Sequence, residues 1–109
     1  GLPTAEFHFI GFLPHKSGQR HKRLSGLKEV PGTWVFYESP HRIERLLEEL
    51  AALYPTLEIV LARELTKKFE EYLSGTPDQV LAQCRTRRLR GEIVLLASFR
   101  SERESPPGA

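Results

Sequence analysis

The sequence predicts an α/β fold: a mixed sheet of about five strands covered by three helices. Two patterns lead to this prediction. Segments rich in β-branched and aromatic residues alternate with segments whose apolar residues recur at helical spacing, in the order β-α-β-α-β-β-α-β. Strands and helices that alternate in this way pack as helices on a sheet. The 109 residues are enough for one domain, and 39% of them are hydrophobic, which excludes a disordered chain.

The first strand and the first helix occupy the N-terminal third of the chain. Residues 6–12 are dense in aromatic side chains and predict a strand. Residues 18–29 predict a helix with Ser17 as its N-cap. A Pro-Gly turn follows, and the β-branched and aromatic residues of 33–37 predict a buried strand.

The middle of the chain carries its most regular helical pattern. Ser39 is the expected N-cap and Pro40 the expected first helical residue. Five apolar residues then recur at helical spacing, namely Ile43, Leu46, Leu47, Leu50 and Leu53. Residues 57–62 are apolar except for Glu58 and predict the next strand.

The last third of the chain predicts two strands and one helix. Residues 69–73 favour a short strand. A full capping box, in which Thr76 is followed three residues later by Gln79, opens a helix that reaches about residue 87. Residues 92–98 predict the last strand. The three most hydrophobic strands, 33–37, 57–62 and 92–98, are expected at the centre of the sheet.

Basic residues concentrate near the first helix, although the net charge of the chain is only +2. Five Lys or Arg and no acidic residue lie between Phe7 and Lys28. Lys16, Arg20 and Arg23 fall along one side of the predicted helix, and groups of this kind neutralise phosphates. An ordinary solvated helix face explains the same pattern, so both interpretations stay open at this point.

Three further segments lie at the ends of the central strands. They are Tyr37 to Arg42, Arg63 to Lys68, and the Gly91-Glu92 pair before the last strand. Open α/β sheets bind ligands at such strand ends, so these segments are candidate ligand contacts. Surface turns and structural ion pairs are the alternatives.

The absence of Met, the single Cys and the lack of long apolar runs indicate what kind of protein this is and in which compartment it is found. The sequence contains no Met, which predicts a fragment of a longer protein. The lone Cys84 cannot form an internal disulfide, favours a reducing cytoplasmic compartment, and is expected to be a small core residue. No apolar run is long enough to span a membrane, and no metal-ligand spacing is present.

Three segments, in this order and spacing, resemble the C-terminal half of the RNA 2′-O-ribose methyltransferases of the tetrapyrrole methylase superfamily. They are Gly-Phe-Leu-Pro-His-Lys-Ser-Gly at 11–18, Phe-Tyr-Glu-Ser-Pro-His-Arg at 36–42, and Ala-Arg-Glu-Leu-Thr-Lys-Lys-Phe-Glu-Glu at 62–71. The resemblance implies the C-terminal domain of a class III methyltransferase at 6–99, preceded by an interdomain linker at 1–5. The polar residues 100–109 are expected to form a disordered tail.

The resemblance also implies a function. Such enzymes use S-adenosylmethionine to methylate the ribose 2′-hydroxyl of a cytidine in small-subunit ribosomal RNA, within or outside the 30S subunit. They are bacterial, cytoplasmic homodimers, and the cofactor lies between two domains. This chain alone is therefore expected to be inactive. A non-catalytic α/β RNA-binding module and a methylase domain that acts on a tetrapyrrole are the alternatives, and the basic segment argues against the second.

The resemblance assigns roles to particular residues. Those expected to contact the cofactor, many through backbone groups, are Tyr37, Glu38, Ala62, Arg63, Gly91, Glu92 and Ile93. Those expected to face RNA phosphates are Lys16, Arg20, Lys22, Arg23, His41 and Arg42. His15 and His21 stand where the family has arginine. No residue identifies itself as the catalytic base, and Glu38, Glu64 and Glu92 are candidates only by position.

Overall fold

The elements along the chain match the predicted order. A computed structural model describes residues 6–65, 68–87 and 91–99. Its elements are β1 (Phe7–Gly11), α1 (Ser17–Gly26), the 3-10 turn η1 (Leu27–Glu29), β2 (Thr33–Glu38), α2 (Ile43–Leu53), β3 (Glu58–Leu65), β4 (Lys68–Gly75), α3 (Pro77–Arg85) and β5 (Ile93–Ser98). The prediction of five strands and three helices is confirmed. The expected linker at 1–5 and tail at 100–109 lie outside the described residues.

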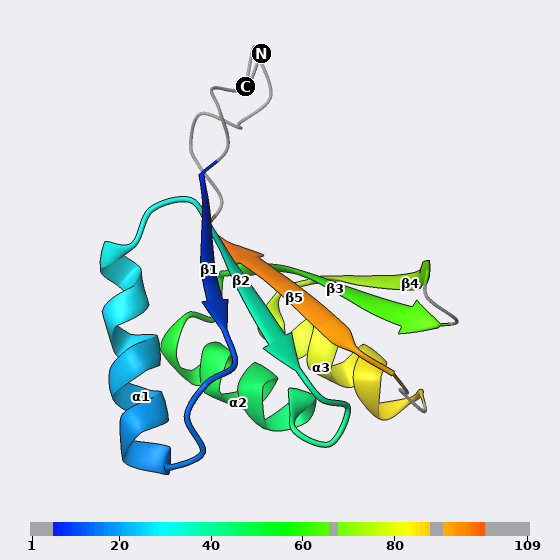
Figure 1. The fold of residues 1–109 in the computed structure, drawn as a ribbon, viewed down its shortest axis with the longest axis horizontal. Helices are drawn as coiled ribbons and strands as arrows, with labels where there is room; N and C mark the ends of the chain where they lie inside the picture. The colour runs from blue at the N-terminus through cyan, green and yellow to red at the C-terminus, as the bar shows by residue number, and fades with distance from the viewer. Residues whose placement is uncertain (1–5, 66–67, 88–90, 100–109) are drawn as a thin grey trace.

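The five strands form one mixed sheet in the order β1-β2-β5-β3-β4 (Figure 1). β1 pairs with β2 in parallel, and the other three pairings are antiparallel. The three inner strands are therefore β2, β5 and β3, which are the three that the hydrophobicity of the sequence placed at the centre. β5 is the last of the described strands in sequence, and it lies between β2 and β3.

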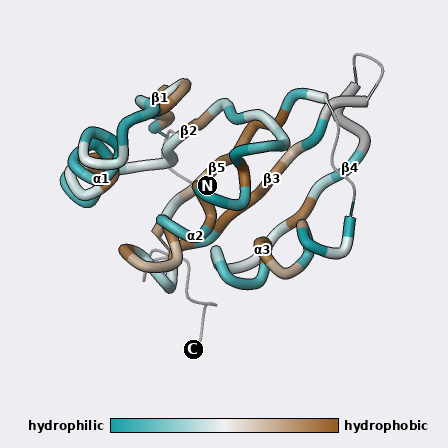
Figure 2. Tube along the Cα trace, turned by 90° about the horizontal axis from the view of Figure 1, so that it is seen from below, coloured by the Kyte–Doolittle hydropathy of each residue, from teal (hydrophilic) through white to brown (hydrophobic). Residues whose placement is uncertain are grey.

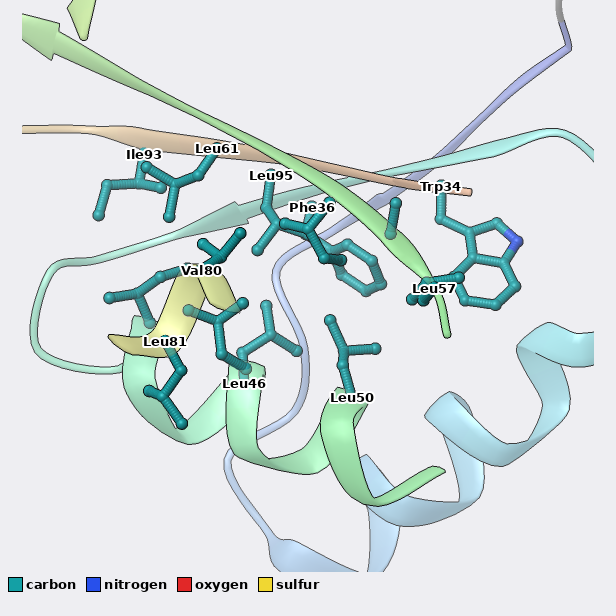
Figure 3. Close-up of a cluster of buried hydrophobic side chains, with 14 of the residues drawn as sticks. Trp34, Phe36, Leu46, Leu50, Leu57, Leu61, Val80, Leu81, Ile93 and Leu95 are labelled. Atoms are coloured by element: carbon teal, nitrogen blue, oxygen red, sulfur yellow. The ribbon is translucent and has the colours of Figure 1, made fainter. Parts of the chain in front are cut away.

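The helices lie on one face of the sheet, and none of the described helices lies on its other face (Figure 2). Alternate side chains of the inner strands, such as Trp34, Phe36 and Leu95, are fully buried on the helix side. They pack against apolar residues of α2 and α3, among them Leu46 and Val80 (Figure 3). The side chains between them point to the opposite face, which is apolar and exposes several aromatic rings: Phe7, Phe9, Tyr37 and Tyr72.

Only one of the three predicted helix caps forms. Thr76 and Gln79 make the full capping box at the start of α3, as predicted. The Ser17 hydroxyl instead accepts a hydrogen bond from Arg45 at 3.0 Å, and Lys16 occupies the N-cap position of α1. α2 begins at Ile43 rather than at Pro40. The Ser39 carbonyl accepts hydrogen bonds from the amides of both Arg42 and Ile43, which forms a turn ahead of the helix.

Candidate functional site

The residues expected to contact the cofactor lie side by side at one end of the inner strands. In one row across β2, β5 and β3, Tyr37 pairs with Val94, which pairs with Ala62. The neighbouring row joins Glu38, Ile93 and Arg63. Side chains of successive residues point to opposite faces of a strand, so the first row faces the open side of the sheet and the second faces the helices.

A cavity of about 430 Å³ opens where β2 ends and β5 begins. We call it the sheet-edge pocket; its lining residues are Phe12, Tyr37, Glu38, Ser39, Pro40, Gly91, Glu92, Ile93 and Val94. Five of the seven residues expected at the cofactor lie in this lining. Ala62 and Arg63 are absent from it, but each is paired with a lining residue of β5. The volume is within the usual range for small-molecule sites.

Aromatic rings form one wall of the sheet-edge pocket. The Tyr37 ring lies edge-on to Phe9, with 4.9 Å between the ring centres, and 5.8 Å from the ring of Phe12. All three rings are more than a third exposed. Phe12 was not identified from the sequence, because it carries no polar group and was placed inside the predicted strand 6–12, whereas β1 ends at Gly11.

Two polar groups lie inside the pocket. Glu38 is only 5% exposed, and its carboxylate accepts a hydrogen bond from the Ser39 amide at 2.9 Å. The Ser39 hydroxyl is buried and has no hydrogen-bond partner among the described residues. A carboxylate and a free hydroxyl beside aromatic rings can bind a ligand that carries both a flat apolar group and hydroxyl or amino groups.

The backbone at the mouth of the pocket is accessible on the β5 side. Gly91 has a φ of +78°, a conformation that L side chains rarely adopt, and it directly precedes Glu92. Both residues are exposed. Backbone groups at this turn can therefore approach a ligand closely.

Arg63 is engaged on the helix side of the sheet. Its guanidinium lies 2.9 Å from the carboxylate of Glu71 on β4, and Glu71 also accepts from Arg87 at 3.1 Å. The Arg63 side chain is only 13% exposed. Any contact of Arg63 with a ligand in the sheet-edge pocket would involve its backbone or require this ion pair to open.

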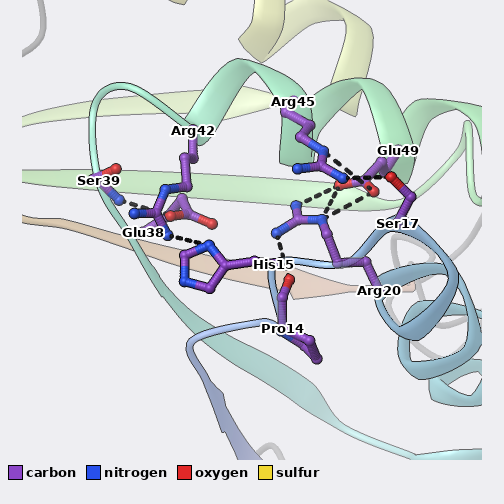
Figure 4. Close-up of polar contacts among 9 residues, drawn as sticks. All are labelled: Pro14, His15, Ser17, Arg20, Glu38, Ser39, Arg42, Arg45 and Glu49. Atoms are coloured by element: carbon purple, nitrogen blue, oxygen red, sulfur yellow. Dashed lines mark hydrogen bonds and ion pairs between the residues drawn. The ribbon is translucent and has the colours of Figure 1, made fainter.

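Most of the expected RNA contacts are exposed, and they form two groups. His41 and Arg42 lie in the turn after β2, where an Arg42 guanidinium nitrogen is 3.3 Å from Nδ1 of His15 (Figure 4). Lys22 and Arg23 lie further along α1. Lys16, at the start of α1, is also exposed.

Arg20 is the exception among these basic residues, because its side chain is only 1% exposed. Its guanidinium donates to both carboxylate oxygens of Glu49 and to the carbonyl of Pro14 (Figure 4). Arg45 approaches the same carboxylate at 4.0 Å. Arg20 therefore holds α1 against α2 and presents no group to an RNA phosphate, contrary to the expectation from helical spacing.

Three other expectations concern bases, metals and membranes. Of the candidate bases, Glu38 and Glu92 line the sheet-edge pocket, whereas the side chain of Glu64 lies outside the described part of the structure. Across residues 6–65, 68–87 and 91–99, no three His, Cys, Asp or Glu side chains gather as a metal site requires. None of the helices in this same part of the chain has the length and apolarity to cross a membrane.

Comparison with known proteins identifies relatives that match most of the chain. The model of the tetrapyrrole (corrin/porphyrin) methylases matches residues 1–81. A protein of Halalkalibacterium halodurans named ribosomal RNA small subunit methyltransferase I is 38% identical over 106 residues, and the alignment covers 97% of this chain. Proteins of the same name from Bacillus subtilis and a Hydrogenobaculum species are 36% and 42% identical and cover 95% and 90% of it.

The chain matches only part of each relative. It spans 37%, 36% and 43% of the lengths of those three proteins. A solved structure, the cobalamin biosynthetic enzyme cobalt precorrin-4 methyltransferase, superposes with a TM-score of 0.62 at 17% identity. That alignment covers 89% of this chain and 42% of the other, and at this identity it establishes the fold alone. The expected membership of the tetrapyrrole methylase family is confirmed.

Proposed function

We propose, since this chain belongs to the tetrapyrrole methylase family, that it forms one side of the cofactor cleft of a methyltransferase that uses S-adenosylmethionine. The observation that carries the proposal is the sheet-edge pocket, where five of the residues expected at the cofactor meet. The remaining wall of the cleft would come from the part of the relatives that this chain does not span.

The residues of the sheet-edge pocket suit S-adenosylmethionine in kind. The rings of Phe12 and Tyr37 would pack against the adenine. The Glu38 carboxylate would accept hydrogen bonds from the ribose hydroxyls, and the Ser39 hydroxyl would donate or accept one. When bound, the cofactor supplies a methyl group activated by a sulfonium. The chain holds and orients that group and keeps water from one side of it, and such positioning supplies much of the rate in a transfer reaction.

The proposed acceptor is the ribose 2′-hydroxyl of a cytidine in small-subunit ribosomal RNA, free or within the 30S subunit. The relatives from bacteria carry names that state ribosomal RNA as their substrate. The exposed His41 and Arg42 lie beside Ser39 and Pro40 of the pocket lining, so RNA phosphates bound there would approach the cofactor. The proposal includes assembly as a homodimer in the bacterial cytoplasm.

A chimeric protein tests the proposal directly. The chain is joined behind the part of the Halalkalibacterium halodurans relative that it does not match, and methyl transfer from S-adenosylmethionine to small-subunit RNA is measured. We expect transfer by the chimera and none by the 109-residue chain alone. Transfer by the chain alone would refute the division of the cleft between two parts. Light scattering of the chimera measures its oligomeric state, and a monomer would contradict the homodimer.

Two tyrosines in one row of the sheet offer a matched pair of variants for the cofactor site. Tyr37 lines the sheet-edge pocket, whereas Tyr72 faces the same side of the sheet on the edge strand β4. Calorimetric titration of the chimera with S-adenosylmethionine should show about tenfold weaker binding for Tyr37→Ala, equivalent to about 1.4 kcal/mol. Tyr72→Ala should bind like the unmodified chimera. Equal losses in the two variants, or no loss in either, would exclude this pocket as the cofactor site.

A further inference from the structure

We propose that a second pocket, on the outer side of α1, receives an unstacked base of single-stranded RNA while Lys22 and Arg23 contact the adjacent phosphates. This inference rests on the RNA substrate of the proposed function. It adds the place on the protein where the RNA strand is bound and the form of RNA, single-stranded, that is recognised.

The second pocket, which we call the α1 pocket, has a volume of about 440 Å³. Its lining residues are Pro14, Gln19, Lys22, Arg23, Gly26, Leu27 and Val30. The four from α1 recur at i, i+3, i+4 and i+7, so they form one face of the helix. The neighbouring face, with Arg20 and Leu24, is buried. Leu27 is 1% exposed, and together with the half-buried Pro14 and Val30 it makes an apolar floor.

The cations at the rim of the α1 pocket have no ionic partner. Among the described residues, neither Lys22 nor Arg23 forms an ion pair or a side-chain hydrogen bond. In contrast, several arginines elsewhere each face a carboxylate: Arg20, Arg45, Arg63, Arg85 and Arg87. The positive charge at the α1 pocket is therefore available to an external anion.

A nucleotide matches this combination of an apolar floor and a cationic rim. Its base is flat and largely apolar on its faces, and its phosphate is anionic. The Arg23 guanidinium offers a planar surface on which a base can stack. In an RNA duplex the bases are stacked and paired, and a protein meets mainly phosphates and 2′-hydroxyls. Occupation of the floor therefore requires an unpaired, unstacked base.

Two glycines of α1 provide a matched pair of variants. Gly26 lines the α1 pocket and has a right-handed helical φ of −74°, and a Cβ built on it meets no atom within 4 Å. A leucine fits there without backbone strain and occupies pocket space. Gly18 lies in the same helix, is equally unobstructed, and is outside the lining. Both substitutions replace a helical glycine with a better helix former, so neither should lower stability.

The test is RNA binding by the 109-residue chain, followed by fluorescence anisotropy. The probe is a labelled oligoribonucleotide of about ten nucleotides, used as a single strand and annealed into a duplex. Gly26→Leu should weaken single-strand binding by about fivefold or more, because about 1 kcal/mol or more of base stacking is removed. It should leave duplex binding unchanged. Gly18→Leu should stay within about twofold for both probes, as surface substitutions usually do.

The contribution of Lys22 and Arg23 is tested by the salt dependence of the RNA affinity. Lys22→Gln combined with Arg23→Gln should weaken binding of both probes. For the single strand, the slope of log K against log salt should become about 0.7 less steep for each phosphate that the variant no longer neutralises. Arg85→Gln removes an exposed, already paired arginine on α3 and should leave the slope unchanged.

Three results would overturn the inference. The first is that Gly26→Leu binds the single strand as tightly as the unmodified chain, and the second is that Gly26→Leu loses as much affinity for the duplex as for the single strand. The third is that a polyglutamate peptide displaces the single strand at the same concentration as competitor RNA. These outcomes are separate from those of the methyl-transfer experiment. If the chimera methylates RNA and Gly26→Leu has no effect, only the α1 pocket is refuted. If Gly26→Leu acts as expected but the chimera neither binds cofactor nor transfers methyl groups, the proposed function fails instead.

Discussion

The buried pair of Arg20 and Glu49 predicts an asymmetric response to the loss of either partner. Arg20 is 1% exposed, and its guanidinium has three hydrogen-bond connections to Glu49 and one to the Pro14 carbonyl. Glu49 is 23% exposed and also approaches Arg45. Removal of the carboxylate leaves a buried charge without a counter-ion. Removal of the guanidinium leaves a carboxylate that water can reach.

The magnitudes follow from this difference in burial. Glu49→Ala should lower the free energy of unfolding by about 3 kcal/mol, the lower end for a broken buried pair, because the Pro14 carbonyl still accepts from Arg20. Arg20→Met should cost only about 1 to 2 kcal/mol, since the methionine fills the space of the arginine stem. Replacement of both residues, Arg20→Met with Glu49→Leu, should return stability to within about 1 kcal/mol of the original.

Urea unfolding measured by fluorescence provides the assay, because the single tryptophan, Trp34, is completely buried. Arg85→Ala serves as the control, since its exposed ion pair with Glu44 should contribute less than about 1 kcal/mol. If Glu49→Ala costs no more than Arg20→Met, Arg20 escapes to water and the reasoning is wrong. Arg20→Met should also leave the salt dependence of RNA binding unchanged, unlike the loss of Lys22 and Arg23.

Three further predictions concern single positions. Burial, with a smaller contribution from Glu44, raises the pKa of the Cys84 thiol from 9.0 to about 11. As the pH rises, the thiol therefore ionises in the unfolded chain before it ionises in the folded one. Between pH 9 and about pH 11, the urea midpoint of the unmodified chain should fall more steeply with rising pH than that of Cys84→Ala. Thr76→Ala should lower the free energy of unfolding by about 1 kcal/mol, and an unchanged urea midpoint would contradict the capping role. Gly32→Ala should lower the melting temperature sharply, because φ is +87° and the new Cβ would clash with the Glu6 carbonyl oxygen. An unaltered melting temperature would show that this turn can rearrange.

Local patterns in the sequence were sufficient to predict the elements and the inner strands. The capping box at Thr76 predicted the start of α3 because both of its hydrogen bonds are made between residues three apart. The hydrophobic strands at the centre could be identified because inner strands are buried by both neighbours. In contrast, the start of α2 was misplaced, because the turn formed by Ser39 depends on backbone hydrogen bonds that residue preferences do not specify.

The one-sided packing of the helices could not be predicted. β2 is apolar on both faces, so Tyr37 and Trp34 look equally suited to the core, although Tyr37 is 38% exposed and Trp34 is fully buried. Arg20 was misassigned for a related reason. Its helical spacing placed it with Lys16 and Arg23, but its partner Glu49 lies 29 residues further along the chain. Only the packing of α1 on α2 brings the two together.

The position of β5 determines when this domain can form during synthesis. β2 and β3 have no hydrogen bonds to each other, and each pairs with β5 instead. Until Ile93–Ser98 has left the ribosome, the sheet can exist only as a β1-β2 pair and a β3-β4 pair, and β2 and β3 each expose an unpaired strand edge. Folding of the sheet must therefore wait for its final strand, and contacts that join distant parts of a chain slow folding. Before β5 emerges from the ribosome, the nascent chain exposes unpaired edges of β2 and β3 that can pair with strands of other chains. During this stage of synthesis the chain most needs protection from aggregation.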